Sequence, residues 1–441
     1  MRTVSEQVGP VAPPRWLRGP WRWLVLALAA AFFFAPVGVR VFGVRAKPIE
    51  NRPLVAFPPL SRGFHIFADL TQWSIDHLPL RKLAVRTNAR LSEDLFGEPP
   101  TYNVAGAPVG IGQGAALAGG ARPAPGGSFD NMVISGSHGW LFLGDEFVRG
   151  CTPDFTLTQF TAALRRLDTI VTASGRKLVL IVAPDKDTVD QRFVSSSTPF
   201  AACSRQAKAE RWAALGALGL PDFVDLLPRL QVEERTTGQP SFLALDSHWS
   251  DRSSTTVFVK SMLDALSPSL YASARVAPGP RQAYTGDLSV LNGAPMQGSD
   301  VRWLLTRPGV APGATTTTTP FLNFPITHYV NAARPGVPLV RPHTLLYGDS
   351  FSVRALDQIA PFFADLTYIP EVSRGAVEGP QARAAAIAAL AEQIRSADVV
   401  VVEQAERELV SAVGSILAPD VLDALQSALA KAPRGRGLSV R

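Results

Sequence analysis

Two short motifs about a hundred residues apart contain the side chains that serine-based acyl chemistry needs. Asp246 and His248 stand in the first motif, Asp246-Ser247-His248-Trp249, and Ser350 stands in the second, Gly348-Asp349-Ser350-Phe351. A serine hydroxyl is a weak nucleophile until an imidazole accepts its proton, and a carboxylate fixes the tautomer of that imidazole and stabilises the imidazolium. Ser350 is therefore the candidate nucleophile, His248 the candidate general base and Asp246 the candidate orienting acid.

The spacing of the first motif restricts the backbone that can use it. Asp246 and His248 are two residues apart, so their side chains point the same way from an extended segment and nearly opposite ways from a helix. Ser250 and Asp251 then supply a helix start. We expect the motif on a loop between a strand and a helix. The alternative is a surface histidine that pairs casually with an acid.

The second motif follows the apolar run Leu345-Leu346-Tyr347, which predicts a buried strand. A helix is expected directly after the turn, so its first N–H groups and its dipole favour negative charge beside Ser350. This position is the carboxyl edge of the sheet, where open α/β folds bind their ligands. Asp349 is expected to accept backbone hydrogen bonds in the turn. The alternative is an ordinary strand-to-helix turn capped by serine.

Strand and helix patterns alternate along most of the chain and predict an α/β fold, with a mostly parallel sheet covered by helices on both faces. A hairpin is expected over residues 131–147, and the Pro- and Thr-rich residues 268–340 are expected to be an excursion over the active face rather than core. The expected strands are 178–183, 223–226, 345–347, 366–369 and 399–402, and the expected helices are 61–95, 158–173, 206–218, 353–363 and 381–396.

An apolar, uncharged run extends from Trp23 to Val39, close to the about 20 residues that a membrane-spanning helix needs. Arg15, Arg18 and Arg22 precede it, and this positive flank predicts an N-terminus in the cytoplasm with the rest of the protein outside. We expect a retained anchor that places the protein in the cell membrane by a single pass. The alternative is a cleaved signal peptide, which would export the same residues.

The whole chain of 441 residues, 46% of them apolar, is long enough for a sizeable core, and this excludes a disordered protein. The net charge of +6 comes partly from arginines at the two ends, so we expect no nucleic-acid partner. No Walker sequence, dinucleotide-binding glycine pattern or metal-binding histidine pair occurs, so we expect no cofactor and no metal. The expected segments are a basic stretch 1–22, the anchor 23–45, a helix and Gly/Pro-rich linker 46–130, a catalytic domain 131–415, and a C-terminal helix and basic tail 416–441.

The chain has two cysteines, Cys151 and Cys203, both in polar sequence that favours loops. Because the predicted compartment permits disulfides, we expect them to be paired. The alternative is two free buried thiols, and no histidine or further cysteine lies near them at the spacing of a metal site.

Several short pieces together resemble the SGNH hydrolase-like alginate O-acetyltransferases, exported proteins that O-acetylate bacterial exopolysaccharides. They occur in the family's order over most of residues 50–410. The pieces are Gly139-Trp140-Leu141-Phe142, Pro184 with Lys186 and Thr188, Asp246-Ser247-His248-Trp249, Gly286-Asp287-Leu288, Gly348-Asp349-Ser350-Phe351, and Glu403 with Glu406-Arg407.

This resemblance implies an SGNH hydrolase-like, flavodoxin-like fold with Ser350 as nucleophile, His248 as base and Asp246 as its orienter. The acid and histidine precede the serine, whereas ordinary SGNH esterases have the serine first, so the order favours the transferase branch. The chain departs from the family at His138, where an acidic residue is usual, and at Ser247, where threonine is usual. The resemblance also implies a multispanning membrane acyltransferase as acetyl donor and a polysaccharide as acceptor.

The sequence thus predicts an extracytoplasmic O-acetyltransferase that passes an acetyl group through Ser350 to hydroxyls of a cell-surface polysaccharide. A carbohydrate esterase would use the same three residues with water as the acceptor. A noncatalytic scaffold of the cell envelope is the third interpretation.

Overall fold

The computed structural model describes residues 133–433 apart from 197, 199, 293–294, 318–324, 372–378 and 413, and also Trp23, Leu24, Ala27, Phe57 and Trp73. The chain divides into two compact units, Met1–Thr87 and Asn88–Arg441, and the fold below belongs to the second. Within the described residues no helix is long and apolar enough to cross a membrane. The expected anchor 23–45 lies almost entirely outside them, as do the segment 1–22, the helix 61–95 and the linker, so these stay predictions.

A seven-stranded sheet in the order β4-β3-β13-β11-β12-β9-β8 forms the centre of the second unit. The strands from β4 to β12 are parallel, and each of the long ones is a nearly continuous apolar run, as expected for strands buried on both faces. The predicted mostly parallel sheet is confirmed. The parallel strands are β3 (Lys177–Ala183), β4 (Phe223–Asp225), β11 (Thr344–Gly348), β12 (Asp365–Pro370) and β13 (Val399–Ala405).

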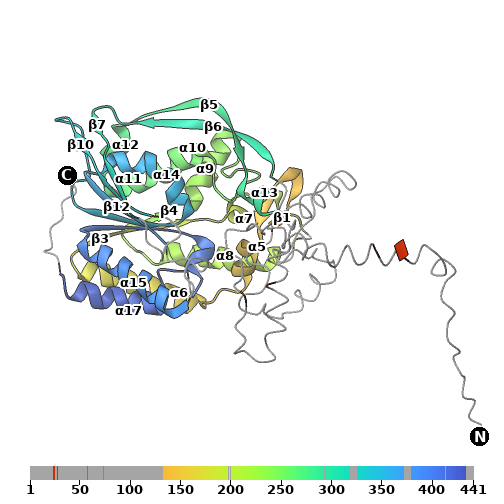
Figure 1. The fold of residues 1–441 in the computed structure, drawn as a ribbon, viewed down its shortest axis with the longest axis horizontal. Coiled ribbons are helices and arrows are strands. Elements are labelled where there is room, and N and C mark those ends of the chain that lie inside the picture. Colours follow the sequence, from red (N-terminus) through yellow and green to blue (C-terminus); the bar gives the residue numbers. More distant parts are fainter. Residues whose placement is uncertain are drawn as a thin grey trace, which may run out of the picture. The chain divides into compact units, whose positions relative to one another are not determined.

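Helices cover both faces of this sheet, because successive side chains of a strand point to opposite faces. Along β13, Val399 and Val401 pack on one face while Val400 and Val402 pack on the other. Figure 1 shows α6, α15 and α17 on one side and α11 and α14 on the other. The first face carries α9 (Leu227–Thr237), α10 (Asp251–Ser253), a π-helical turn (Ser254–Val259), α11 (Lys260–Leu266), α12 (Pro268–Ala272) and α14 (Ser350–Ile359). The second carries α6 (Leu157–Ala173), α8 (Ala201–Ala217), α15 (Gly379–Ser396) and α17 (Pro419–Ala430).

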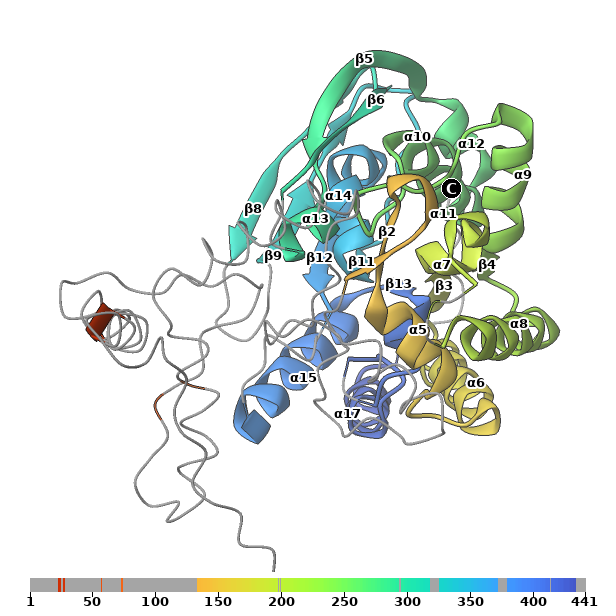
Figure 2. The ribbon, with the colours of Figure 1, turned by 90° about the vertical axis from the view of Figure 1, so that its right-hand side faces the viewer.

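Residues 268–340 differ from the expected excursion. They form a long antiparallel ribbon, but they also add two antiparallel strands to the edge of the central sheet, where β9 pairs with β12. Figure 2 shows the ribbon on the side of the sheet that carries α14. The two edge strands were not predicted because they are short and half exposed, and the segment is rich in threonine and proline. The elements are β5 (Arg275–Thr285), α13 (Asp287–Leu291), β6 (Gln297–Thr306), β7 (Val310–Ala311), β8 (Ala314–Thr317), β9 (Ile326–Val330) and β10 (Ala332–Ala333).

The order of the parallel strands explains why the acid and histidine precede the serine. Counted from β11, the strands β11, β12, β13, β3 and β4 lie in the spatial order 2-1-3-4-5, the flavodoxin-like arrangement. The chain therefore has that arrangement in a permuted order, with β3 and β4 placed before β11. The order reverses between β11 and β13, so a ligand site is expected at the carboxyl ends of these two strands.

The hairpin and the cysteines lie at the same carboxyl edge. Strands β1 (Val133–Ser135) and β2 (Leu141–Leu143) pair as expected, but α5 (Gly144–Cys151) begins before the predicted end of the hairpin. Cys151 and Cys203 form the predicted disulfide, with their Cα atoms 5.3 Å apart. Both cysteines belong to helices rather than loops, because α8 begins at Ala201 and not at 206. The shorter helices at this edge are α7 (Lys186–Val189) and α16 (Glu406–Leu409).

We expect the double variant Cys151→Ala and Cys203→Ala to unfold at a lower denaturant concentration than the wild type. The disulfide closes a loop with a sequence separation of 52 residues, and the chain-entropy model assigns about 4 kcal/mol of unfolding free energy to such a loop. Denaturant unfolding followed by circular dichroism measures the difference. A variant as stable as the oxidised wild type would show that α5 and α8 hold together without the bond.

Candidate active site

Ser350 is the first residue of α14 and follows the last residue of β11 by two positions. Asp349 caps this helix, since one of its carboxylate oxygens accepts a hydrogen bond from the Phe351 N–H at 2.8 Å. The other oxygen accepts from the Ala405 N–H at 2.7 Å, at the end of β13. The expected structural role of Asp349 is therefore confirmed. The carboxylate ties the serine turn to the neighbouring strand at the reversal of strand order.

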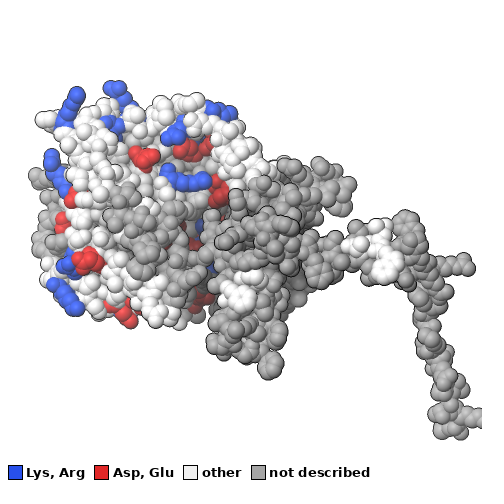
Figure 3. Space-filling view, viewed as in Figure 1, with Lys and Arg blue, Asp and Glu red and all other residues white. Residues whose placement is uncertain are grey.

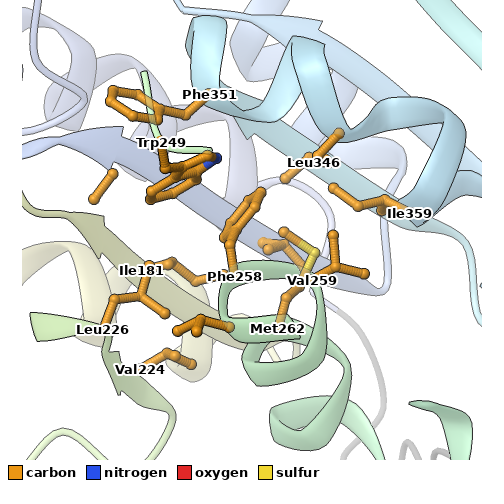
Figure 4. Packing of buried hydrophobic residues seen from close by; sticks show 14 of the residues in the cluster. Ile181, Val224, Leu226, Trp249, Phe258, Val259, Met262, Leu346, Phe351 and Ile359 are labelled. Carbon is orange, nitrogen blue, oxygen red and sulfur yellow. The ribbon is translucent and has the colours of Figure 1, made fainter. Parts of the chain in front are cut away.

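The Asp246-Ser247-His248 segment lies in a loop before a helix, α10, as predicted, but the element before the loop is the helix α9 rather than the expected strand. A single β-bridge between Phe242 and Trp249 closes this loop, and Ser250 caps α10 by accepting from the Ser253 N–H. Trp249 is buried between Phe351 and Phe258, with ring centroids 4.5 and 4.8 Å away (Figure 4). The aromatic contact therefore packs the loop against the helix that carries Ser350.

The structure brings the three predicted site residues together. His248 Nε2 lies 2.7 Å from Ser350 Oγ, and His248 Nδ1 lies 2.7 Å from Asp246 Oδ1. When Nδ1 donates its proton to Asp246, Nε2 is left as the acceptor for the Ser350 hydroxyl. Ser350 remains half-buried, whereas His248 and Asp246 are buried. This geometry can transfer a proton from the serine to the histidine.

Burial alone would lower the pKa of His248, but its hydrogen bonds to Asp246 and Asp287 outweigh burial and raise the pKa above its usual value. Burial would raise the pKa of Asp246, yet the bond from His248 and the charge of Arg354 hold it below its usual range. Arg354 Nη2 donates to Asp246 Oδ2 at 2.9 Å, from one helical turn beyond Ser350. Asp246 is thus ionised and faces both the imidazole of His248 and the guanidinium of Arg354.

Asp287, at the start of α13, is the site residue to which the sequence assigned no role. Its Oδ2 lies 3.3 Å from His248 Nδ1, and both the N–H and the hydroxyl of Ser247 donate to its carboxylate at 2.7 and 2.6 Å. The Gly286-Asp287-Leu288 piece was the one signal that pointed to this position. In the part of the chain that the structure describes, Asp246, His248 and Asp287 are the one group of side chains spaced like metal ligands. They form hydrogen bonds with one another and with Ser247 and Arg354.

Lys186 holds the acid-histidine loop in place by donating hydrogen bonds to its backbone oxygens. Its side chain is fully buried, and its ammonium nitrogen lies 4.7 Å from the Trp140 ring centroid. Four oxygens lie within hydrogen-bonding distance of the three ammonium protons, so at least one proton is shared between two acceptors. Burial lowers its pKa to about 8. The four acceptors lie 2.6–3.0 Å from Nζ and are the backbone oxygens of Leu141, Leu243, Ala244 and Asp246.

Further buried ionisable groups surround the carboxyl edge of the sheet. Asp185 pairs with Lys208 at 2.8 Å and with Arg407 at 2.9 Å. Glu403 accepts from the Ser352 hydroxyl at 2.6 Å, two residues after Ser350, and burial together with the charge of Asp349 raises the pKa of Glu403 well above its usual value. These residues support the serine turn and the end of β13 rather than reaching His248.

Other histidines in the described residues lie elsewhere. His138 is exposed in the hairpin turn with a left-handed φ of 58°, and its ring lies 6.2 Å from that of Phe193. His328 pairs with Asp365 at 2.8 Å on β9 and β12.

On the face in Figure 3, basic and acidic side chains are interspersed among uncharged ones.

Comparisons with known proteins bear on Asp246 and His248, two of the three predicted site residues. Residues 133–304 match the family model described as SGNH hydrolase-like domain, acetyltransferase AlgX, a segment that contains Asp246 and His248 but ends before Ser350. The resemblance expected from the motifs is confirmed over this segment. No curated protein matches the chain.

Three similar solved structures cover about two thirds of this chain. The O-acetyltransferase domain of Pseudomonas putida AlgJ is 21% identical over 67% of this chain and 99% of that one, with a TM-score of 0.43. Pseudomonas aeruginosa AlgX is 14% identical over 67% of each chain, with a TM-score of 0.43. Bacillus cereus PatB1 is 11% identical over 65% of this chain and 98% of that one, with a TM-score of 0.42.

We expect Lys186→Met to lower the free energy of unfolding by about 3 kcal/mol, because it leaves buried carbonyl oxygens without a donor. Lys431→Met is the matched control, since Lys431 is exposed after α17. Denaturant unfolding of both variants checks the difference. Equal stability of the two variants would contradict the role assigned to the ammonium.

We also expect His248 to titrate above 6.5, the usual value for histidine, because of its acidic partners. Nuclear magnetic resonance of isotope-labelled histidine measures this pKa, with the His248 signal identified by its loss in His248→Gln. The same signal in Asp246→Asn should move to lower pH. A His248 pKa at or below 6.5 would contradict the hydrogen bonds described here.

Proposed function

We propose that this protein is an O-acetyltransferase that moves an acetyl group through Ser350 to a hydroxyl of a polysaccharide. The observation that carries the proposal is the 2.7 Å contact between His248 Nε2 and Ser350 Oγ, with Nδ1 of the same ring on Asp246. The match of residues 133–304 to an acetyltransferase family model supports the same class of reaction.

In the first half of the reaction, Ser350 Oγ attacks the carbonyl carbon of the acetyl donor while His248 Nε2 accepts the hydroxyl proton. The negative charge that develops on the carbonyl oxygen is stabilised by the amino-terminal end of α14, where the helix dipole is positive. Collapse of the tetrahedral intermediate breaks the bond to the leaving group, which takes the proton from His248. The product is Ser350 acetylated on Oγ.

In the second half, a sugar hydroxyl takes the place of the leaving group. His248 Nε2 accepts its proton, the sugar oxygen bonds to the acetyl carbon, and Ser350 leaves as the free hydroxyl after it regains the proton. A pocket between the β5–β6 ribbon and α14 is lined in part by Tyr284, Arg302 and Arg354, and Arg354 connects it to the site by its ion pair with Asp246. Aromatic rings and guanidinium groups of this kind bind sugars by stacking and hydrogen bonding, so this pocket is suited to the acceptor.

The proposed setting is the outer side of the cell membrane. It rests on the apolar run 23–39 with its arginine flank and on the Cys151–Cys203 disulfide, which fits an oxidising compartment. Acetyl-CoA is absent there, so we propose a multispanning membrane acyltransferase as the donor, with the anchor keeping the two proteins together.

The test is to incubate the purified protein with p-nitrophenyl acetate and candidate glycans, and to measure released nitrophenol and acetylated sugar. We expect Ser350→Ala and His248→Ala each to lower turnover by up to roughly a millionfold, because the two residues act as a unit. Ser269→Ala is the control, because Ser269 is exposed on α12.

The possible outcomes separate the three functions. Acetylated glycan that depends on Ser350 supports the transferase. Acetate released with Ser350 intact, and no acetylated sugar from any glycan, would replace it with the esterase. Turnover unchanged in Ser350→Ala and His248→Ala would leave the scaffold.

A further inference from the structure

The imidazole of His248 faces two carboxylates, Asp246 and Asp287. Among the described residues only Asp246 also forms an ion pair with a guanidinium, that of Arg354. Asp246 Oδ2 receives Arg354 Nη2 at 2.9 Å, so the charge of Asp246 is shared between a guanidinium and the imidazole. Asp287 pairs with no cation in the described part of the chain other than His248. Burial would raise the pKa of Asp287, but its bonds to His248 and Ser247 outweigh burial and lower it, so the carboxylate is ionised.

This arrangement has a simple charge balance. With Asp246, Asp287 and Arg354 ionised and His248 neutral, these four side chains carry one net negative charge, and their sum becomes zero when His248 accepts a proton. The ammonium of Lys186, which donates to the backbone oxygen of Asp246 at 3.0 Å, is a further cation that acts on both carboxylates. An imidazolium in a buried site is stabilised when the surrounding charges balance it. Arg354 offsets the negative charge of Asp246, so Asp287 supplies the negative charge that balances the imidazolium.

The backbone around Asp287 is built for this close approach. A Cβ on Gly286 would lie 2.0 Å from the carbonyl oxygen of Leu245, so a glycine is needed for α13 to lie against the acid-histidine loop. The Asp287 N–H donates to Asp246 Oδ2 at 3.3 Å, and Leu288 is fully buried in a small cluster that includes Leu245. The first turn of α13 is therefore held against the loop by backbone packing, a hydrogen bond and an apolar contact.

We infer that Asp287 is a second positioning residue for His248, which orients the Nδ1 side of the ring together with Asp246 and balances the charge of the imidazolium. The inference rests on the proposed function, in which His248 is the base. It assigns a role in the reaction to the segment between β5 and β6, which brings this carboxylate to the base from outside the two motifs.

The competing role for Asp287 is purely structural, as the acceptor for the N–H and hydroxyl of Ser247. The two roles separate by charge. Asp287→Asn keeps an oxygen that accepts from Ser247 and removes the charge, whereas Asp287→Glu keeps the charge. Ser247→Ala removes one hydrogen bond of Asp287 and the 3.2 Å contact of the Ser247 hydroxyl with His248 Nδ1, but no charge.

The experiment measures the His248 pKa by nuclear magnetic resonance of labelled histidine, together with the pH dependence of kcat/KM for p-nitrophenyl acetate. We expect Asp287→Asn to lower the His248 pKa by about one unit and to move the acidic limb of the rate profile to lower pH by the same amount. Asp287→Glu should restore most of the shift and Ser247→Ala should move the pKa less than Asp287→Asn does. Arg354→Gln should move it to higher pH. Asp423→Asn, on the exposed face of α17, is the control for loss of a carboxylate.

An unchanged His248 pKa in folded Asp287→Asn would overturn the inference, and so would a shift in Ser247→Ala as large as that in Asp287→Asn. If Asp287→Asn does not fold, Asp287→Ser removes the same charge and leaves a smaller polar side chain at this position. The resonance measurement needs no turnover. If the variants shift the His248 pKa as expected but turnover does not depend on Ser350, the proposed function is refuted, whereas the pairing of Asp287 with His248 is retained.

Discussion

The hydrogen bond between the Ser350 hydroxyl and His248 Nε2 is the interaction on which the site depends, because it joins residues 102 positions apart in the sequence. Neither residue reaches the other without support. On the serine side, Asp349 caps α14 and ties the turn to the end of β13. On the histidine side, the buried ammonium of Lys186 gathers the backbone oxygens of the loop. The permuted strand order brings these two supports to the same edge of the sheet, where its order reverses.

The carboxyl edge of the sheet contains many buried charged and ionisable groups. Their main effect is to fix the geometry of the backbone rather than to add stability. Buried ion pairs such as that of Asp185 with Arg407 lose hydration on folding, so they add little net stability even at short distance. They do restrict the backbone to an arrangement in which each charge has its partner. We interpret them as the frame that holds the serine turn and the acid-histidine loop within hydrogen-bonding distance.

The parts predicted from the sequence are those with strong local patterns. The run from Leu178 to Ala183 predicted β3 to within one residue, since a strand buried on both faces is continuously apolar. The two-residue spacing of Asp246 and His248, and the glycine turn before Ser350, identified the residues that the structure brings together. The edge strand β9 was missed because its side chains alternate weakly in polar sequence. Asp287 reaches His248 through the packing of α13, so the Gly286-Asp287-Leu288 piece could mark the position but not its contact with the histidine.

The central claim, that Ser350 is the nucleophile activated by His248, is tested most directly by locating the acetyl group on the enzyme. The protein is mixed with p-nitrophenyl acetate, quenched in acid within the first turnover, digested and analysed by mass spectrometry. The account predicts acetylation of the peptide that contains Ser350 in the wild type and its loss in His248→Ala. Acetylation elsewhere, or acetylation of Ser350 at the same rate without His248, would contradict it.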